Sequence, residues 1–193
     1  MNAVFIKSAV SPGDFPPDLG AEVAVVGRSN SGKSSAINAM LGSSKLARVS
    51  KTPGRTQLIN FFALGDDRRC VDLPGYGFAR VSEGVRRGWE TMMRGYFESR
   101  ESLRGLMITV DIRRGIGDLD VQMLDWCSAL GVPVCILATK ADKLSRNKAH
   151  QAVAAMSRDA VSWDAAVIAF SSLNGSGIEG AREQLDRWLS EAE

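Results

Sequence analysis

The residues best suited to chemistry lie in one stretch, Gly27–Ser34, which reads GRSNSGKS after the apolar run Val23–Val26. In the pattern G-x-x-x-x-G-K-S, glycines let the backbone curve so that successive N–H groups point at phosphate oxygens. A helix expected over Ser35–Leu41 would add the positive end of its dipole. Lys33 would reach the β- and γ-phosphates, and the Ser34 hydroxyl would bind Mg²⁺. The stretch predicts a nucleotide phosphate site formed by Gly27, Arg28, Ser29, Asn30, Ser31, Gly32, Lys33 and Ser34.

A second motif, D-x-x-G, closes the strand expected over Arg68–Leu73. The Asp72 carboxylate can hold a water molecule of the Mg²⁺ shell, and the Gly75 N–H can reach the γ-phosphate. Any acidic turn can match so short a pattern, so the motif gains its meaning from its place after the phosphate loop. We expect nucleotide contacts from Asp72, Leu73, Pro74 and Gly75.

The segment Gly42–Gln57 lacks an apolar period and is expected to be a long functional loop. Thr56 in this loop is the candidate second protein ligand of Mg²⁺, able to engage only when a γ-phosphate is present. Thr52 is the competing choice. The expected metal ligands are therefore Ser34 and Thr56 directly, and Asp72 through water.

The stretch Thr139–Asp142, TKAD, follows a buried strand and indicates which base is bound. A carboxylate accepts two hydrogen bonds from the N1–H and the exocyclic amine of guanine, whereas adenine would leave Asp142 without a partner. The Lys140 stem would lie along the base plane. After the last strand, Phe170, Ser171 and Ser172 could place backbone N–H groups against guanine O6. The predicted base contacts are Thr139, Lys140, Ala141, Asp142, Phe170, Ser171 and Ser172.

The order of elements predicts an α/β fold in which a six-stranded, mostly parallel sheet has helices on both faces. One strand is expected to be antiparallel, because the short link Gly65–Asp67 joins two strands as a hairpin. Residues 1–20 read as a proline-rich lead-in, and residues 21–193 read as one domain that binds its ligand at the carboxyl ends of the strands. The expected strands are Val23–Val26, Leu58–Leu64, Arg68–Leu73, Leu106–Val110, Val132–Ala138 and Ala165–Phe170. The expected later helices are one that buries Val85, Trp89, Met92, Met93, Tyr96 and Phe97, followed by Asp118–Leu130, Arg146–Met156 and Ile178–Leu189.

Composition limits the other functions open to this chain of 193 residues. A formal charge of +2 is too small to indicate a nucleic-acid partner, so any such surface must be local. Cys70, Cys127 and Cys135 form no C-x-x-C pair and read as reduced core residues. His150 is the only histidine, which excludes sites built on histidine clusters. The absence of a signal peptide or membrane-length apolar run predicts a cytoplasmic protein without a membrane partner.

Taken in order, GRSNSGKS, TPGRTQ, DLPG, TKAD and FSS resemble the translation-factor-related small GTPases, and within them the EngB group, also called YihA or YsxC. The resemblance covers essentially the whole chain. It implies a Ras-like P-loop GTPase domain that binds GTP, GDP and Mg²⁺ and acts in maturation of the large ribosomal subunit, with a link to cell division and septation. It implies the large subunit and its rRNA as partners, and we expect a monomer that does not bind DNA. It extends the expected nucleotide contacts to Gly54, Arg55, Thr56, Gln57 and Leu58.

Two departures from the wider GTPase pattern carry expectations of their own. Thr139 replaces the usual asparagine of N-K-x-D. This would remove an amide that ties the guanine loop, Thr139–Asp142, to the phosphate loop, Gly27–Ser34, and would give modest nucleotide affinity. Tyr76 stands where Ras-type enzymes have the glutamine that positions water, so intrinsic hydrolysis should be slow. Asn30 lies where potassium-activated relatives carry an asparagine beside K⁺; a neutral turn residue is the alternative. The expected catalytic set is Lys33, Thr56, Gly75 and Asn30.

Three functions remain open at this point: a GTP-driven switch that docks on an RNA–protein particle, a P-loop kinase for a small metabolite, and a GTP/GDP-binding protein with negligible turnover. TKAD with FSS favours the switch, because a kinase needs an acceptor pocket and a lid that the sequence does not offer. A surface that binds rRNA could lie in the segment after D-x-x-G; the alternative is a basic face that only contacts solvent. The arginines concerned are Arg80, Arg86, Arg87 and Arg94. Arg113–Arg114 is the next candidate for rRNA binding.

Overall fold

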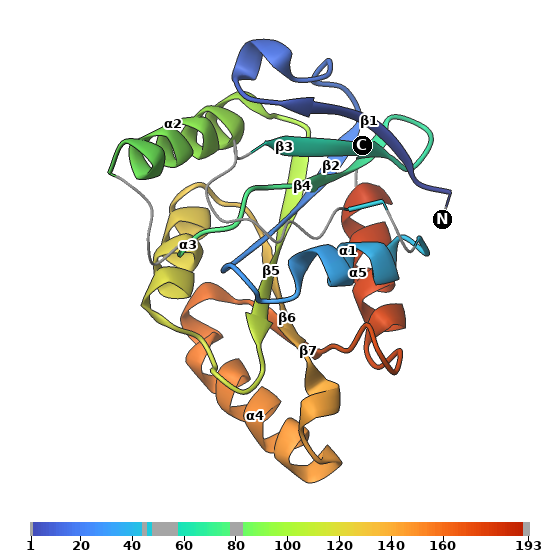
Figure 1. The fold of residues 1–193 in the computed structure, drawn as a ribbon, viewed down its shortest axis with the longest axis vertical. Coiled ribbons are helices and arrows are strands. Elements are labelled where there is room, and N and C mark those ends of the chain that lie inside the picture. The colour runs from blue at the N-terminus through green and yellow to red at the C-terminus, as the bar shows by residue number, and fades with distance from the viewer. Residues whose placement is uncertain (1, 44–45, 48–57, 78–82, 191–193) are drawn as a thin grey trace.

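The computed structural model describes residues 2–43, 46–47, 58–77 and 83–190, apart from the side chain of Val85. Strands and helices alternate along most of the chain (Figure 1). The strands are β1 (Val4–Ala9), β2 (Ala21–Gly27), β3 (Ile59–Ala63), β4 (Arg68–Asp72), β5 (Leu103–Asp111), β6 (Val134–Thr139) and β7 (Ala166–Ala169). The α-helices are α1 (Lys33–Met40), α2 (Glu83–Ser99), α3 (Asp118–Ala129), α4 (Arg146–Asp159) and α5 (Ile178–Ser190), with short 3-10 turns η1 (Pro12–Asp14), η2 (Ala141–Lys143) and η3 (Val161–Trp163).

The strands form one sheet in the order β1-β3-β4-β2-β5-β6-β7. β2 pairs in parallel with β4 and β5, and the parallel ladder continues through β6 to β7. β3 runs against both of its neighbours, so the predicted single antiparallel strand is confirmed. The predicted hairpin at Gly65–Asp67 is also confirmed, and all three of its residues have positive φ. The α/β fold therefore agrees with the expectation from the sequence.

The sheet has seven strands, and the expected number of six was wrong. The additional strand, β1, comes from the first residues of the chain and pairs with β3. The ring of Phe5 packs beside that of Phe62 at 5.9 Å. The prolines that follow form η1 and an irregular stretch, so they end the strand without preventing it. Pairing with β3 supplies the partner that this short apolar run lacks on its own.

Helices cover both faces of the sheet and divide the core into two clusters (Figure 1). On one face, α2, α3 and α4 bury Tyr96, Leu124 and Met156, among others. On the opposite face, α1 and α5 bury Ile37 and Leu185. β2, β5 and β6 lie between the two clusters, which explains their almost continuous apolar sequences.

The residues predicted for the core mostly lie there. On α2, Met92, Met93, Tyr96 and Phe97 are buried and Trp89 packs against them, which confirms that Trp89 belongs to the core. The three cysteines are buried and free, and burial raises the pKa of each thiol to about 12. Such thiols stay protonated and behave as small apolar groups.

A buried ionic cluster fixes the lead-in at the amino end of β2. The Glu22 side chain is fully buried and accepts hydrogen bonds from Arg69 Nη1 and Tyr96 Oη, each at 3.1 Å, and from the Arg100 guanidinium. Arg100 also donates to the Pro16 carbonyl at 2.8 Å. The cluster lies at the end of β2 opposite to the phosphate loop, so it supports the fold without contributing to the site.

No described helix combines the length and apolar character needed to cross a membrane.

Candidate nucleotide site

The phosphate loop connects the buried strand β2 to α1, as predicted. Strand β2 ends at Gly27, where a Cβ atom would overlap Thr109. The loop turns through Asn30, with φ of 65°, and Gly32, with φ of 96°, which caps α1. Glycine adopts that conformation without strain, whereas a side chain there would oppose it. α1 begins at Lys33, two residues before the expected start, so both Lys33 and Ser34 lie in its first turn, where the positive end of the helix dipole favours an anion.

Three side chains from neighbouring strand ends support the loop from behind. The hydroxyls of Ser31 and Thr109 lie 2.7 Å apart. The Thr139 hydroxyl contacts the Ser31 carbonyl oxygen, and Lys140 Nζ donates to the Asn30 carbonyl oxygen at 2.6 Å. The loss of the asparagine amide therefore does not remove the tie between the two loops, because the Thr139 hydroxyl makes a contact of its own, and the expected modest nucleotide affinity stays a prediction. The Thr139 hydroxyl contacts the Ser31 carbonyl oxygen in place of an amide. Lys140 adds a second, charged hydrogen bond, which goes to the Asn30 carbonyl oxygen.

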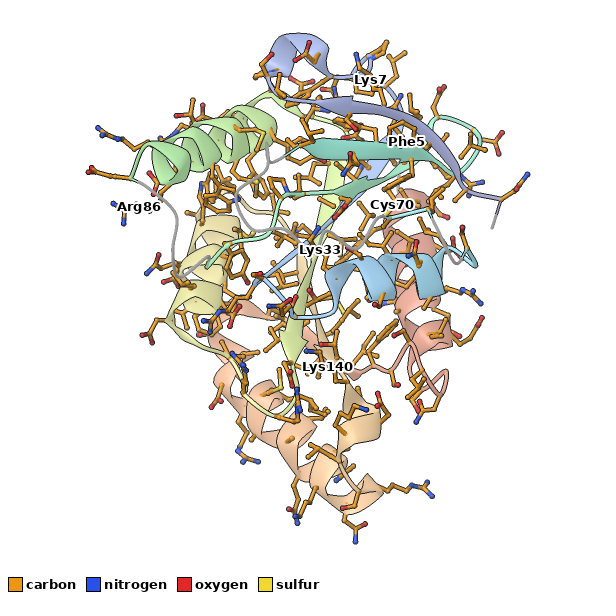
Figure 2. The ribbon with its side chains drawn as sticks, viewed as in Figure 1. Phe5, Lys7, Lys33, Cys70, Arg86 and Lys140 are labelled. Carbon is orange, nitrogen blue, oxygen red and sulfur yellow. The ribbon has the colours of Figure 1, made fainter. Side chains whose placement is uncertain are left out.

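Lys33 and the D-x-x-G motif meet in front of this loop. The Lys33 ammonium forms an ion pair with Asp72 Oδ1, and Asn60 Nδ2 donates to Asp72 Oδ2 at 3.3 Å. Asp72 is the last residue of β4, which lies beside β2 in the sheet. The Asp72 carboxylate and the hydroxyl of Ser34, the residue that follows Lys33, are hard oxygen donors of the kind that Mg²⁺ prefers, so the residue types present fit this ion. Figure 2 shows Lys33 and Lys140 near the carboxyl ends of the central strands.

The remaining residues predicted for the phosphates and the metal fall in two groups. Thr56 and Thr52 lie outside the described residues, as do Gly54, Arg55 and Gln57. Leu58 is described and directly precedes β3. Leu73, Pro74 and Gly75 continue from β4 without regular structure, and Leu73 N–H donates to the Val25 carbonyl oxygen at 2.9 Å.

Gly75 and Tyr76 lie directly against the phosphate loop. A Cβ at Gly75 would be 2.9 Å from the Gly27 carbonyl oxygen, which is too close for any side chain. Tyr76 is 6% exposed as a residue; its ring turns away from the loop, and its hydroxyl donates to Asp120 Oδ1 at 2.5 Å. Burial and the neighbouring Asp120 raise the pKa of Tyr76 far above its usual value, so the hydroxyl keeps its proton. The Tyr76 side chain is thus bonded to α3 and does not take the place of the glutamine that positions water in Ras-type enzymes.

The residues predicted to contact the base lie together at the ends of β6 and β7. Asp142 lies in η2, and Ser171 Oγ donates to Asp142 Oδ1 at 2.7 Å. This hydrogen bond is the main cause that lowers the pKa of Asp142, so the carboxylate is ionised and can accept from guanine. Two of the three N–H groups predicted to face O6 are used elsewhere, because Phe170 donates to Ala138 and Ser171 donates to Ser176. Of that predicted set, the Ser172 N–H is the one left for the base.

Sequence reasoning missed Asp111, the last residue of β5. Its carboxylate accepts from Arg113 Nε at 2.9 Å and from Lys140 Nζ at 3.0 Å. Arg113 is the largest of the influences that hold the pKa of Asp111 well below its usual range. Asp111 thereby orients the lysine that donates to the Asn30 carbonyl. The available signal was an acidic residue at the end of a long apolar strand, which on its own is compatible with any turn.

The arginines of α2 are exposed, as the helical spacing predicted, but each lies beside a glutamate. The closest nitrogen–oxygen distances are 3.9 Å for Arg86, 3.6 Å for Arg87 and 3.9 Å for Arg94. Figure 2 shows Arg86 projecting away from the sheet. Arg80 lies outside the described residues. Arg113, of the other candidate pair, is engaged by Asp111.

Comparisons with known proteins agree with this geometry. The family described as 50S ribosome-binding GTPase matches residues 22–140, which contain the phosphate loop, D-x-x-G and the first half of TKAD. A probable GTP-binding protein EngB of Nitrosococcus oceani is 51% identical over 196 residues and covers 98% of each chain. The EngB protein of Escherichia coli is 48% identical over 190 residues, which are 97% of this chain and 90% of that protein.

Solved structures show the same fold. The crystal structure of a probable GTP-binding protein EngB superposes with a TM-score of 0.70 at 21% identity, covering 89% of this chain and all of the other. The structure of Era with MgGDPNP and a segment of 16S ribosomal RNA superposes with a TM-score of 0.66 at 21% identity, covering 90% of this chain and 58% of Era. The chain is a P-loop GTPase and belongs to the EngB family of GTP-binding proteins.

Proposed function

We propose that this GTPase is a nucleotide-dependent switch in the assembly of the large ribosomal subunit, and that its role is linked to cell division and septation. The observation that carries the proposal is the match to a family described as 50S ribosome-binding GTPases across the segment that forms the phosphate site. The Era structure adds a neighbour of the same fold that is bound to ribosomal RNA. We place the protein in the cytoplasm as a monomer in which residues 21–193 form one GTP-binding domain, with residues 1–20 as its lead-in.

In this proposal the chain's own groups bind and orient GTP. The amides of the phosphate loop and the Lys33 ammonium hold the β- and γ-phosphates, so Lys33 exchanges Asp72 for phosphate oxygens. Ser34 and Thr56 would hold Mg²⁺, with Asp72 acting through water; the bound ion supplies Lewis-acid stabilisation of the phosphate oxygens. The Gly75 N–H contacts the γ-phosphate, which makes the D-x-x-G segment sensitive to whether GTP or GDP is bound.

Guanine selection rests on Asp142. Its ionised carboxylate accepts two hydrogen bonds from guanine, and Ser171 keeps the carboxylate oriented. The Ser172 N–H is the available donor for guanine O6. The Lys140 stem lies along the base while its ammonium stays on the Asn30 carbonyl.

Hydrolysis without a partner should be slow. Tyr76 occupies the position after D-x-x-G and is buried against Asp120, so no side chain at that position orients the attacking water. A K⁺ ion beside Asn30 could supply the transition-state charge that an arginine finger supplies elsewhere. A comparison of turnover in KCl and NaCl at equal ionic strength, for wild type and Asn30→Ala, tests this role. Equal rates in the two salts for the wild type would remove K⁺ from the proposal.

The arginines of α2 are proposed to face rRNA. Their ion pairs with glutamates are long and highly exposed, so they are weak and leave the guanidinium groups available. Trp89 Nε1 donates to the Pro74 carbonyl oxygen at 3.1 Å, which connects α2 to the segment that reads the γ-phosphate. Binding to the particle can therefore depend on the nucleotide.

Sedimentation with purified ribosomal subunits tests the proposal. The protein should bind the large subunit with a non-hydrolysable GTP analogue and dissociate with GDP, and it should bind the small subunit weakly in both states. Equal binding to both subunits, or binding that does not depend on the nucleotide, would contradict the proposed role.

A further inference from the structure

Tyr76 links the D-x-x-G segment to two separate parts of the fold. Its backbone pairs with the phosphate loop, because Tyr76 N–H donates to the Gly27 carbonyl oxygen at 3.2 Å and Ser29 N–H donates to the Tyr76 carbonyl oxygen at 2.9 Å. Its side chain points the other way, and its hydroxyl donates to Asp120 Oδ1 at 2.5 Å. One residue thus joins the phosphate loop to the first turn of α3.

The acceptor of this hydrogen bond is itself fixed. Asp120 is 2% exposed, and its second oxygen, Oδ2, accepts from the Gly117 N–H at 2.9 Å in the N-terminal cap of α3. Leu124, one turn further along α3, belongs to the main core cluster. A buried carboxylate with a donor on each oxygen has little freedom, so its position determines where the Tyr76 hydroxyl can lie.

Helix α2 holds the same segment from another side. Trp89 donates to the Pro74 carbonyl oxygen, and its ring stands edge-on to the Tyr76 ring with centroids 6.4 Å apart. Gly75 lies between Pro74 and Tyr76, which these contacts hold in place, and it has no room for a Cβ beside Gly27. The Gly75 N–H is therefore held next to the phosphate loop by contacts on both sides of it.

We propose that Tyr76 and Asp120 are positioning residues for Gly75, and that their hydrogen bond presets the Gly75 N–H for the γ-phosphate of GTP. The inference rests on the proposed contact between Gly75 and that phosphate. A preset donor spares GTP the entropic cost of ordering the segment. GDP lacks the γ-phosphate, so the hydrogen bond discriminates between the two nucleotides rather than strengthening both.

Two conservative variants test the proposal. Tyr76→Phe removes the hydroxyl and keeps the ring against Trp89, whereas Asp120→Asn replaces the carboxylate by an amide of similar shape. Affinities for fluorescent GDP and for a fluorescent, non-hydrolysable GTP analogue are measured with Mg²⁺ present. Each variant should lose about tenfold in affinity for the analogue and less than about twofold in affinity for GDP. The double variant should bind the analogue no more weakly than the single variant with the lower affinity, because both substitutions remove the same hydrogen bond.

Asp125→Asn is the matched control, because Asp125 is on the same helix and accepts from an aromatic side chain, Trp163 Nε1, at 2.7 Å. It should leave both affinities unchanged. A parallel loss of GDP and analogue affinity in Tyr76→Phe would overturn the proposal, because a merely structural role predicts that result. Unchanged affinities in both conservative variants would overturn it too.

Gly75→Ala separates the inference from the function on which it rests. If Gly75→Ala keeps the wild-type ratio of analogue to GDP affinity, the Gly75 contact and this inference both fail, while guanine-nucleotide binding by the wild type stands. If Gly75→Ala loses analogue affinity but Tyr76→Phe and Asp120→Asn do not, the contact stands and the positioning role is wrong.

Discussion

The ammonium of Lys140 lies 2.6 Å from the backbone carbonyl oxygen of Asn30, so the guanine loop and the phosphate loop are joined by a charged hydrogen bond. Asp111 accepts a second hydrogen bond from the same ammonium at 3.0 Å. A residue expected mainly to cover the base therefore also shapes the loop that binds the phosphates. The two halves of the nucleotide site should respond together when this contact is lost.

Lys140→Met removes the ammonium and keeps the apolar stem along the base. We expect affinities for GTP and GDP to fall together by about tenfold or more, because the Asn30 carbonyl and Asp111 each lose a charged donor. Lys148→Met, on the exposed face of α4, is the control and should leave both affinities unchanged. Nucleotide titration by fluorescence measures the effect. A loss confined to one nucleotide would show that Lys140 does not support the loop.

Asp142→Asn should change the base preference. The amide presents a donor where guanine also presents a donor, so GTP affinity should fall by at least about a hundredfold, while XTP, which offers an acceptor there, should gain. Competition between GTP and XTP gives the ratio directly. A variant that keeps the wild-type preference for GTP would show that Asp142 is not the base reader.

The same carboxylate predicts a pH dependence. The Ser171 hydrogen bond lowers the pKa of Asp142 below the usual 3.8, so the ionised acceptor is present above that range and is lost only as the pH falls through the lowered pKa. The preference for GTP over ITP, whose base lacks the exocyclic amine and stays neutral in this range, should therefore be constant from about pH 7 to about pH 5. A marked loss of that preference near pH 6, measured by competition between these two nucleotides, would disagree with the environment of Asp142.

Charge reversal on α2 tests the proposed rRNA surface. Arg86→Glu combined with Arg87→Glu should weaken binding of the GTP-state protein to large subunits and flatten its salt dependence, because two phosphate contacts are lost. Arg146→Glu with Lys148→Glu makes the same change of charge on α4, where both residues are exposed, and should have little effect. Nucleotide affinity should stay at the wild-type value in both variants. Unchanged particle binding by the α2 variant would mean that another surface of the protein binds the particle.

Glu22→Ala should destabilise the fold without changing the site. Removal of the carboxylate leaves Arg69 and Arg100 buried without their main partner, at a cost of about 3–5 kcal/mol in the free energy of unfolding. Glu98→Ala breaks an exposed ion pair of 3.9 Å with Arg94 and should cost less than about 1 kcal/mol. Urea unfolding measures both changes. A small effect of Glu22→Ala would mean that the buried cluster does not anchor the lead-in.

Much of the site could be predicted because its pattern is local. Gly27 and Gly32 fix a loop geometry that few other residues allow, and Asp142 follows directly on a buried strand. The order of apolar runs likewise predicted the sheet, and the short link Gly65–Asp67 predicted the antiparallel β3. These features depend on neighbours in the sequence or on a simple strand-to-loop order.

The missed features depend on contacts between distant segments. β1 is a strand because β3 offers it an edge, and nothing within residues 1–20 indicates that edge. Asp111 and Asp120 look like ordinary turn and helix-start residues until the fold brings Lys140 and Tyr76 to them. The contact made by Thr139 was missed for the same reason, because its hydroxyl meets the Ser31 carbonyl only in the assembled fold.

Single-turnover hydrolysis of GTP, measured with and without purified large ribosomal subunits, tests whether the particle drives this GTPase. We expect slow release of phosphate by the protein alone, since the Tyr76 hydroxyl is bonded to Asp120, and a rate at least about tenfold higher when large subunits are added. Small subunits at the same concentration should leave the rate unchanged. A rate that is the same with and without large subunits, or phosphate release too slow to detect in both cases, would contradict the claim that this GTPase is a switch driven by the particle.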